Sequence, residues 1–578
     1  MTIDCEEKGR RHMREAWVTD VLAGYENDHR PAHEYLRENG EWTAVSRHDL
    51  LWGVQSAARG WREAGLRPGD RVAVEATDPH VFVPAFLGAL WAGVVPVPLP
   101  PPPAAGRHAA WSAHVTAMAR TAQPQVIALR GDTEPPADSG RPVALDSIVA
   151  APPEESPPHN PEPDATAYLQ FSSGSTGNPR AVPARVAAVL ANGRAIMHDG
   201  LRSDPAIDRG LSWLPLHHDM GLVGFVLAPL LACVPVSFIP TRFFVRDPGL
   251  WLRSMSERRA TISFAPNFAF ALSARRTSAE QTAALDLGHV RVLGCGAEPI
   301  NHSVLERFFS TFAPTGLAPE ALMPCYGLAE ATLAVTLSPP DRPYRVDHVR
   351  TAALSAGRAT PVGADPTGET DPADSGAGLP DPADGVSTLV GCGPPLPGNE
   401  IVIRDTHGDT LGERAVGEVW VRGPSVARGY VAAPQETGTS FLPGGWLRTG
   451  DLGYLAEGEL FVTGRVKDLL ILNGRNIDPQ RVEWLAETVP GVRAGGVVAC
   501  TRPGPQSEEL VIVAECRTSA APSLAPALRE AVAAALGIPV HDVVAVRPGT
   551  VPKTTSGKPR RQETRRQYLE GALHVQQG

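Results

Sequence analysis

The chain has 578 residues, of which 43% are hydrophobic and 20% are charged, and its formal net charge is −10. This length predicts two or more domains, because a single hydrophobic core rarely grows beyond about 250–300 residues. The composition excludes a fibrous or disordered chain, and the negative charge argues against a nucleic acid as the main partner.

Residues 45–98 are expected to form one α/β unit. A helical pattern over 50–64 precedes a strand-like run at 71–75, and a second apolar helix over 81–92 precedes a short strand at 94–98. Strands that alternate with helices in this way pair in parallel, with the helices as crossover connections. The sequence therefore predicts an α/β fold.

Two long uncharged runs, 81–106 and 220–241, have the length of membrane spans. Prolines interrupt both runs, so we expect buried helices followed by strands and no membrane span. Seven cysteines are scattered along the chain without C-x-x-C spacing, which fits a reducing compartment and offers neither a disulfide framework nor a zinc site. The first residues are charged and lack the apolar segment of a signal peptide, so we expect a cytoplasmic protein.

A loop rich in Ser, Gly and Thr follows the strand-like residues Tyr168–Phe171. Its backbone N–H groups and hydroxyls are close together and its glycines tolerate positive φ, which favours a concave nest for phosphate oxygens. The loop lacks the Gly-Lys-Ser/Thr ending of a Walker motif. A flexible turn is the alternative, but the loop ends at Pro179 and Arg180 and has matching motifs downstream. The residues predicted to hold phosphates are Ser172, Ser173, Gly174, Ser175, Thr176 and Gly177.

The second half of the chain contains an insertion and a smaller unit. Residues 360–386 are rich in Asp, Gly, Pro and Ala and cannot build a core, so we expect an exposed insertion around 340–386. Strand-like runs return at 400–404 and 417–422. A smaller unit with alternating strands and helices follows residue 464 and ends in a basic tail.

Several segments, in the same order along residues 40–560, resemble the motifs of the adenylate-forming superfamily, which includes acyl-CoA synthetases, luciferases and the adenylation domains of peptide synthetases. They are Trp213-Leu-Pro-Leu-His-His-Asp-Met-Gly221, Gly296-Ala-Glu-Pro299, Tyr326-Gly-Leu-Ala-Glu330, Trp446-Leu-Arg-Thr-Gly-Asp-Leu-Gly453, Gly464-Arg-Val-Lys-Asp468, Asn473-Gly-Arg-Asn-Ile-Asp-Pro479 and Thr555-Ser-Gly-Lys558. Within the superfamily the chain most resembles a fatty acyl-AMP ligase. The resemblance implies a large N-terminal α/β domain of several subdomains (1–464) and a small, mobile α+β C-terminal domain (465–578).

The resemblance also implies a reaction. A carboxylic acid, here a fatty acid, reacts with ATP and Mg²⁺ to give an acyl-adenylate and pyrophosphate. The acyl group then passes to the phosphopantetheine thiol of an acyl carrier protein or carrier domain, for polyketide, lipopeptide or lipid biosynthesis. Alternatives are an acyl-CoA synthetase, an amino-acid-activating enzyme, and a non-catalytic module that docks a carrier protein.

Attack of the carboxylate on the α-phosphate of ATP brings negative charges together. Hydrogen-bond donors and Mg²⁺ must therefore be positioned to neutralise this charge. Glu330 is suited to Mg²⁺, a hard ion that takes one or two carboxylates plus phosphate oxygens, although it could be a solvated glutamate at a helix start. Thr332 is expected near the α-phosphate, and by resemblance Lys558 is the catalytic lysine. The arginines around Lys558 are expected to face solvent or bind anions.

The adenosine site is expected to combine a turn, an aromatic ring and a carboxylate. Backbone at the turn can approach a flat base, and Tyr326 can stack on adenine, with a buried structural role as its alternative. By resemblance, Asp451 and Arg465 contact the ribose. The turn comprises Gly296, Ala297, Glu298 and Pro299, and Gly327, which follows Tyr326, is predicted to belong to the same site.

His217-His218-Asp219 is a candidate for metal or acid–base chemistry. On an extended strand, neighbouring side chains point to opposite faces, so these three would not make a metal tripod. By resemblance His218 gates the acyl pocket, and Asp219 could instead hold a substrate amine. Predicted pocket walls, which could equally be plain core, are His218, Asp219, Met220, Phe225, Phe264, Asn267 and Phe268.

The insertion and the domain boundary bear on the second half-reaction. Fatty acyl-AMP ligases carry extra chain after the Glu330 motif, which packs against the small domain and disfavours transfer to free CoA. Residues 348–361 resemble the ordered part of that extra chain. By resemblance Lys467 is the hinge about which the small domain rotates between the two half-reactions.

Overall fold

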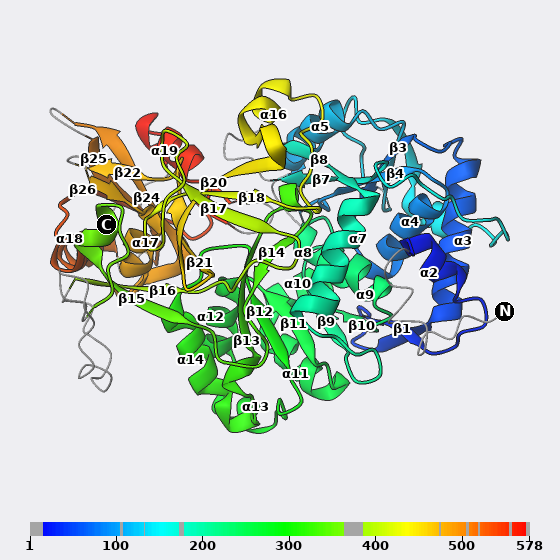
Figure 1. Cartoon of the computed structure of the whole chain (residues 1–578), viewed down its shortest axis with the longest axis horizontal. Coiled ribbons are helices and arrows are strands. Elements are labelled where there is room, and N and C mark those ends of the chain that lie inside the picture. Colours follow the sequence, from blue (N-terminus) through cyan, green and yellow to red (C-terminus); the bar gives the residue numbers. More distant parts are fainter. Residues whose placement is uncertain are drawn as a thin grey trace.

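The computed structural model describes residues 16–103, 108–131, 133–172, 179–362, 385–472, 475–504, 508–517, 521–553 and 558–573. A large body of sheets and helices carries a smaller C-terminal unit at one end (Figure 1). This arrangement confirms the expected α/β class with a large N-terminal part and a small C-terminal part.

A four-stranded sheet in the N-terminal part confirms the predicted parallel unit. Its strand order is β4-β3-β5-β6, and every neighbouring pair is parallel. Helices α3 and α4 pack against each other, and Gly88 allows this because a Cβ there would lie 2.6 Å from that of Ala57. The elements of this region are α2 (Val18–Ala23), α3 (Arg47–Glu63), β3 (Arg71–Glu75), α4 (Pro79–Trp91), β4 (Val95–Leu99), α5 (His108–Ala122), β5 (Val126–Leu129), β6 (Arg141–Ala144) and α6 (Leu145–Val149).

An eight-stranded sheet brings the predicted site segments to one edge. Its order is β14-β13-β12-β11-β9-β10-β1-β2, and β9, β11, β12 and β13 run in parallel. The carboxyl ends of parallel strands share an edge, so the segments after these strands converge. The strands are β1 (Pro31–Leu36), β2 (Trp42–Ser46), β9 (Gly210–Ser212), β10 (Val236–Phe238), β11 (Ile262–Ala265), β12 (Val292–Cys295), β13 (Leu322–Gly327) and β14 (Ala334–Leu337).

Helices cover this sheet, and one group arises from the second uncharged run. That run forms short consecutive segments before β10, as expected for buried helices followed by a strand. In the described ranges no helix combines the length and apolarity needed to cross a bilayer. The helices are α7 (Val186–Arg194), η1 (Ala195–Gly200), α8 (Asp219–Leu222), η2 (Val223–Leu227), α9 (Ala228–Leu231), α10 (Thr241–Arg246), α11 (Gly249–Arg258), α12 (Asn267–Arg276), α13 (Ala279–Ala283) and α14 (His302–Phe312).

The predicted phosphate loop connects an antiparallel hairpin of β7 (Thr166–Ser172) and β8 (Arg180–Arg185). Ser173–Gly177 lie outside the described residues, so their predicted phosphate contacts stay predictions. The insertion opens and closes with another antiparallel hairpin, β15 (Val346–Arg350) and β16 (Val386–Val390), with α15 (Thr351–Ser355) between them.

A third sheet links the large part to the small one. Strands β17 (Glu400–Arg404) and β18 (Gly417–Arg422) coincide with the predicted runs. They join β19 (Phe441–Leu442), β20 (Trp446–Ala456) and β21 (Glu459–Arg465), and helix α16 (Pro434–Ser440) precedes β19. A turn over 466–468 follows β21.

The small unit has its own hydrophobic core, which includes Val482, Ile512 and Leu528. Figure 1 shows it as a compact group of strands and helices beside β17 and β20. Its elements are β22 (Leu470–Leu472), β23 (Arg475–Ile477), α17 (Pro479–Glu487), β24 (Val492–Pro503), β25 (Glu508–Cys516), α18 (Ala521–Leu536), β26 (Val540–Val546) and α19 (Arg561–Leu569).

Candidate active site

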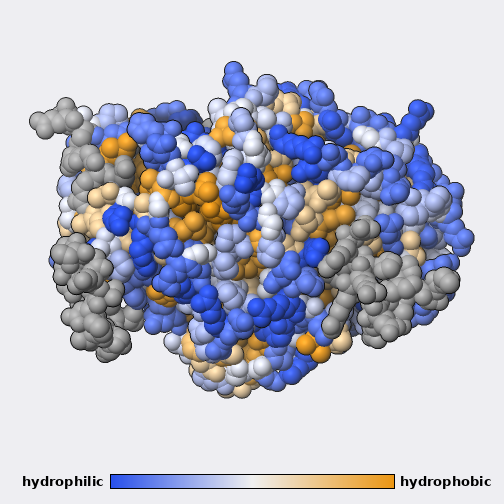
Figure 2. All heavy atoms as spheres, viewed as in Figure 1, coloured by the Kyte–Doolittle hydropathy of each residue, from blue (hydrophilic) through white to orange (hydrophobic). Residues whose placement is uncertain are grey.

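A cavity of about 1750 Å³ lies at the shared strand edge, between the large part and the small unit. On the face drawn in Figure 2, apolar side chains gather where the small unit meets the sheet of β17, β18 and β20. Predicted site residues from distant segments line this one cavity. They are Ser172, His218, Asp219, Met220, Phe225, Phe264, Asn267, Phe268, Ala297, Glu298, Pro299, Tyr326, Gly327, Glu330, Asp451, Arg465, Lys467 and Lys558.

A buried carboxylate joins three of the predicted adenosine residues. The Tyr326 hydroxyl donates to Oδ2 of Asp451 at 2.7 Å, and Nε of Arg465 donates to Oδ1 at 2.8 Å. Burial raises the pKa of Tyr326, and Asp451 raises it further, so the hydroxyl stays a donor. Each carboxylate oxygen can accept a second hydrogen bond, so Asp451 retains capacity for a ligand hydroxyl.

Two glycines let backbone segments approach closely beside this carboxylate. A Cβ on Gly327 would lie 2.0 Å from the carbonyl oxygen of Leu333, and a Cβ on Gly296 would lie 2.5 Å from Sγ of Cys325. Ala297 adopts a φ of +64°, which turns the chain sharply after β12. Gly296 shapes this turn without lining the cavity.

Glu298 fixes the position of a neighbouring helix. Its Oε1 accepts a hydrogen bond from the backbone N–H of Phe268 at 2.6 Å, at the start of α12. Burial raises the pKa of Glu298, while this hydrogen bond and Lys558 act in the opposite direction. The side chain therefore connects the segments after β11 and β12.

Glu330 follows β13 and accepts two hydrogen bonds. Ser172 Oγ donates to its Oε1 at 3.2 Å, and the hydroxyl of Tyr430 donates to the same oxygen at 2.9 Å. Arg180 in turn donates to the Tyr430 hydroxyl at 3.3 Å and lies over its ring at 5.2 Å. The second oxygen of Glu330 has no hydrogen bond recorded among the described residues, which suits a ligand for a cation.

Sequence reasoning missed Tyr430 and left Arg180 without a role. Tyr430 lies in a loop far from any recognised motif, so no local pattern marked it. Arg180 could have been identified from the sequence, because it is the basic residue at the end of the predicted phosphate loop. Thr332 donates its hydroxyl to the carbonyl oxygen of Ser425 at 2.8 Å and does not line the cavity, and its contact with an α-phosphate stays a prediction.

Lys558 reaches the cavity from the small unit. Its loop is closed at the base by a bridge between Lys553 and Pro559. Burial lowers the pKa of Lys558 and Arg465 lowers it further, whereas Glu298, Asp219 and Asp451 oppose the shift. The ammonium group thus lies among carboxylates contributed by the large part.

The segment His217-His218-Asp219 is a turn that leads into α8, so the prediction of an extended strand was wrong. Strand β9 ends at Ser212, and Pro215 follows it, so the extended backbone stops before the histidines. Asp219 accepts from the backbone N–H of Met220 at 2.8 Å, and burial raises its pKa to about 6. Burial lowers the pKa of His218 to about 4, so the ring is neutral near neutral pH. No cluster of three or more His, Cys, Asp or Glu capable of holding a metal occurs within the described ranges.

Apolar side chains, among them Met220, Phe225 and Phe264, line part of the cavity, and we call this part the apolar branch. Two π-helical segments, η1 and η2, contribute to its wall, and such segments are frequent at functional sites. Sequence reasoning named Met220, Phe225, Phe264, Asn267 and Phe268 as walls, and all five line the cavity. It missed further lining residues, because their apolar runs resemble ordinary core. The additional lining residues are Ile196, Met197, Leu201, Gly224, Pro229, Val234, Ile262, Leu333, Ala334 and Leu337.

The insertion contacts the small unit through a hydrogen bond from Arg481 on α17 to Oγ1 of Thr351 at 3.2 Å. Residues 363–384, the remainder of the insertion, lie outside the described residues.

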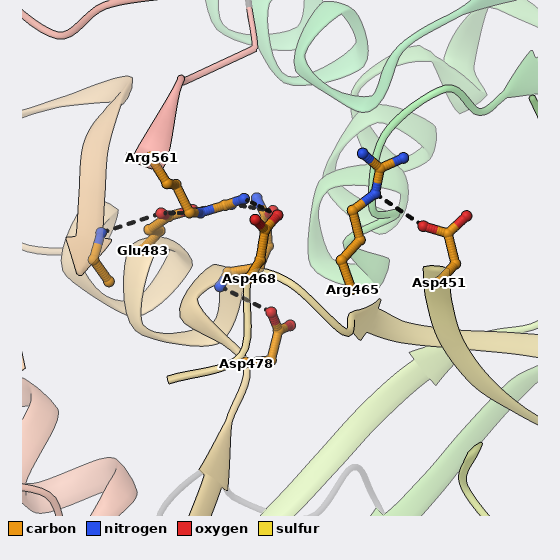
Figure 3. A network of polar contacts seen from close by, with 8 residues as sticks. Asp451, Arg465, Asp468, Asp478, Glu483 and Arg561 are labelled. Atoms are coloured by element: carbon orange, nitrogen blue, oxygen red, sulfur yellow. Dashed lines mark hydrogen bonds and ion pairs between the residues drawn. The ribbon is translucent and has the colours of Figure 1, made fainter. Parts of the chain in front are cut away.

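The basic tail differs from expectation at Arg561, whose side chain is only 18% exposed and pairs with Glu483 and Asp468 (Figure 3). These arginines were expected to face solvent or to bind anions; Arg561 does not face solvent, and it pairs instead with carboxylates from other segments of the chain.

Comparison with known proteins agrees with this geometry. Residues 23–431 match a family model described as AMP-binding enzyme. A Caulobacter vibrioides protein named provisionally as an acyl-CoA synthetase is 38% identical over 517 residues, which span 88% of this chain and 87% of the relative. The long-chain-fatty-acid–AMP ligase FadD26 of Mycobacterium tuberculosis is 36% identical over 530 residues, 86% of each protein. A structure solved in a study of fatty acyl-adenylate ligases from E. coli and L. pneumophila superimposes with a TM-score of 0.85 at 34% identity, covering 97% of this chain and 98% of that chain.

Proposed function

The chain belongs to the AMP-binding enzyme family of adenylate-forming ligases, and from this premise we propose that it converts a fatty acid and ATP into a fatty acyl-adenylate and pyrophosphate. The observation that carries the proposal is the convergence on one cavity of Lys558, Glu330, Asp451 and an apolar branch. A reaction between two anions needs a cation at the point of attack, and the apolar branch offers space for an alkyl chain.

Each polar group has a proposed part in adenylate formation. Asp451 accepts hydrogen bonds from the ribose hydroxyls while Arg465 and Tyr326 hold its carboxylate in place. The backbone turn at 296–299 and the ring of Tyr326 contact the adenine. Lys558 donates to the carboxylate of the acid and to the α-phosphate, which offsets the charge that develops as the new P–O bond forms and the bond to pyrophosphate breaks.

Glu330 fits a magnesium site in which most ligands are phosphate oxygens. Mg²⁺ binds through one or two carboxylates plus substrate phosphates and does not need an all-protein cage, so Glu330 can serve without a cluster of protein ligands. Bound with ATP, the ion would neutralise phosphate charge. Ser172 and Tyr430 orient the Glu330 carboxylate, and Ser173–Gly177 are proposed to hold the β- and γ-phosphates.

A fatty acid is the favoured substrate because the branch beyond His218 is lined by aliphatic and aromatic side chains. Met220, Phe225, Phe264, Asn267 and Phe268 form the predicted wall, and η1 and η2 extend it. An amino acid would place its ammonium group near Asp219, and amino-acid activation is the alternative that the substrate screen must exclude.

For the second half-reaction we favour the phosphopantetheine thiol of an acyl carrier protein as the acceptor, in the biosynthesis of a lipid, polyketide or lipopeptide in the cytoplasm. The contact between Arg481 and Thr351 supports this acceptor, because it opposes the rotation of the small unit that transfer requires. A docked carrier protein can offset that cost through contacts of its own, whereas free CoA makes fewer contacts. We assign the domain boundary to 464/465 and the hinge to Lys467, which lies in the turn between β21 and β22.

Pyrophosphate release with acids of increasing chain length, an aryl alkanoic acid and amino acids tests the proposal. Long-chain fatty acids should give the highest kcat/KM, and preference for an amino acid would overturn the substrate class.

Free CoA should add little turnover, whereas a holo carrier protein should accept the acyl group. Arg481→Ala should increase acyl-CoA formation while Arg547→Ala, an exposed arginine on the same unit, should not; efficient acyl-CoA formation by the unaltered protein would favour an acyl-CoA synthetase.

A further inference from the structure

Arg561 makes an extensive set of polar contacts in the small unit (Figure 3). Its Nε and one terminal nitrogen donate to the two carboxylate oxygens of Glu483, both at 2.7 Å. The other terminal nitrogen donates to Asp468 at 3.1 Å, and a further hydrogen bond reaches Gln480 at 2.8 Å. Three separate side chains therefore fix the plane of one guanidinium group.

The location of this arginine is unfavourable for a helix. Arg561 is the first residue of α19, and a cation at a helix N-terminus is repelled by the helix dipole. Glu483 is only 3% exposed, and a buried carboxylate is costly unless it is paired and fully hydrogen-bonded. Both oxygens of Glu483 are hydrogen-bonded to Arg561, and Oε1 also accepts from the backbone N–H of Ala499 at 3.1 Å. Helix stability alone does not account for Arg561.

The contacts of Arg561 instead connect the Lys558 loop to the rest of the small unit. Lys558 lies three residues before Arg561. The bridge between Lys553 and Pro559, and the hydrogen bond from Arg560 N–H to the carbonyl of Pro552 at 2.8 Å, close the loop on itself. These contacts join the two ends of the loop to each other and do not orient it relative to the rest of the small unit. Arg561 attaches the loop to α17 through Glu483.

Asp468 extends the same connection to the segment that joins the two parts of the molecule. It lies in the turn after β21, next to Lys467. One guanidinium group thus touches the turn, helix α17 and the helix that follows the Lys558 loop. A rotation at the turn would carry the loop with it as one body.

We propose that Arg561 is a positioning residue for adenylate formation: held by Glu483 and Asp468, it fixes the Lys558 loop to the turn and to α17, so that the lysine enters the cavity in one defined position. This inference rests on the proposed function. Its effect belongs to the half-reaction that uses Lys558 and not to transfer of an acyl group already on AMP.

Arg561→Ala is compared with Arg566→Ala, an arginine of the same helix that is 56% exposed and pairs only with Glu563 and Glu570 among the described residues. With the fatty acid that the unaltered protein activates best, Arg561→Ala should lower kcat for pyrophosphate release at least about 10-fold, with KM for ATP changed less than about 3-fold. Transfer from supplied acyl-adenylate to the acceptor should stay within about 2-fold, and Arg566→Ala should change neither rate.

Two further measurements separate positioning from loss of structure. In a Lys558→Ala background, Arg561→Ala should cause no additional loss, because a residue that acts through the lysine has nothing left to position. Glu483→Gln keeps the volume of the side chain and should reproduce the selective loss if Arg561→Ala fails to fold.

Equal loss of both half-reactions, or additive loss on Lys558→Ala, would overturn the proposal. An unaltered protein that activates no acid would overturn the proposed function and this inference together. An active protein whose Arg561→Ala and Glu483→Gln variants keep full activity would overturn the inference alone.

Discussion

Arg465 and Asp468 are three residues apart in the chain, but their side chains bind different parts of the molecule. Nε of Arg465 lies 2.8 Å from Asp451 on β20, and Asp468 lies 3.1 Å from Arg561 in the small unit (Figure 3). The backbone N–H of Val466 is also held, by the carbonyl of Gly450 at 3.0 Å. A rotation between the two parts is therefore most easily absorbed at the torsions around Lys467.

Lys467→Pro should separate the two half-reactions. Proline locks φ near −65° and restricts the residue before it, so the small unit would be held in one orientation. Because Lys558 already lies in the cavity, adenylate formation should survive at a useful rate while transfer to a carrier protein falls about 100-fold or more. Both rates are measured on one folded preparation.

Lys467→Ala is the matched control, since it removes the side chain and keeps the backbone freedom. It should leave both rates nearly unchanged. Equal losses of adenylation and transfer in Lys467→Pro would show that this position is not the hinge.

Glu330→Gln should reduce pyrophosphate release by about 100-fold, because an amide is a poor ligand for Mg²⁺ and carries no charge. Raising the Mg²⁺ concentration should restore part of the rate. Tyr430→Phe removes one hydrogen bond to Glu330, so we expect a loss of only about 5–10-fold at saturating Mg²⁺. A Glu330→Gln variant with an unchanged Mg²⁺ dependence would remove this residue from the metal site.

Gly224→Leu should shorten the acids that the enzyme accepts. A Cβ on Gly224 would lie 3.5 Å from Cδ2 of Leu333, so a leucine side chain would project into the apolar branch. We expect kcat/KM for hexadecanoic acid to fall about 10-fold or more and that for octanoic acid to change little. Gly412→Leu, at an exposed loop glycine with no atom near its Cβ, is the control. Equal losses for both acids would mean that the alkyl chain does not occupy this branch.

Asp478→Asn should change how stability depends on pH. Burial raises the pKa of Asp478 from 3.8 to about 7, so the folded protein keeps a proton that the unfolded chain loses. The free energy of unfolding therefore falls as pH rises between these two values, by up to about 1.4 kcal/mol per pH unit. Asparagine still caps α17 through the N–H of Gln480 but has no proton to lose.

Thermal unfolding of both proteins near pH 5 and near pH 8 measures this effect. The midpoint of the Asp478→Asn protein should rise relative to that of the unaltered protein as pH increases. Parallel midpoints over this range would contradict the raised pKa of Asp478.

Local patterns in the sequence predicted much of the fold. The β3, β17 and β18 strands have the expected limits, since their apolar alternation is bounded by turn residues. Asp451 and Arg465 were both expected at the ribose, and the two residues face each other on the antiparallel strands β20 and β21. Where a motif and its partner are close in sequence or share a strand pair, sequence reasoning is effective.

Long-range contacts account for what was missed. Tyr430 reaches Glu330 from a loop 100 residues away, and Glu483 lies 78 residues before Arg561, so no local pattern links either pair. A run of basic residues is typical of a solvent-exposed segment. That Arg561 is an exception becomes clear only when its carboxylate partners in the folded chain are known. The apolar branch was hidden for a related reason, because cavity lining and solid core have the same composition.

Direct detection of acyl-adenylate tests the central claim. The purified protein is incubated with ATP, Mg²⁺ and a labelled long-chain fatty acid without an acceptor, and acid-quenched samples are separated by chromatography. We expect acyl-AMP to form in amounts comparable to the enzyme, and Lys558→Ala, with an unchanged unfolding midpoint, to form at least about 100-fold less in the same time. Absence of acyl-AMP from the unaltered protein, or normal amounts from Lys558→Ala, would contradict this account.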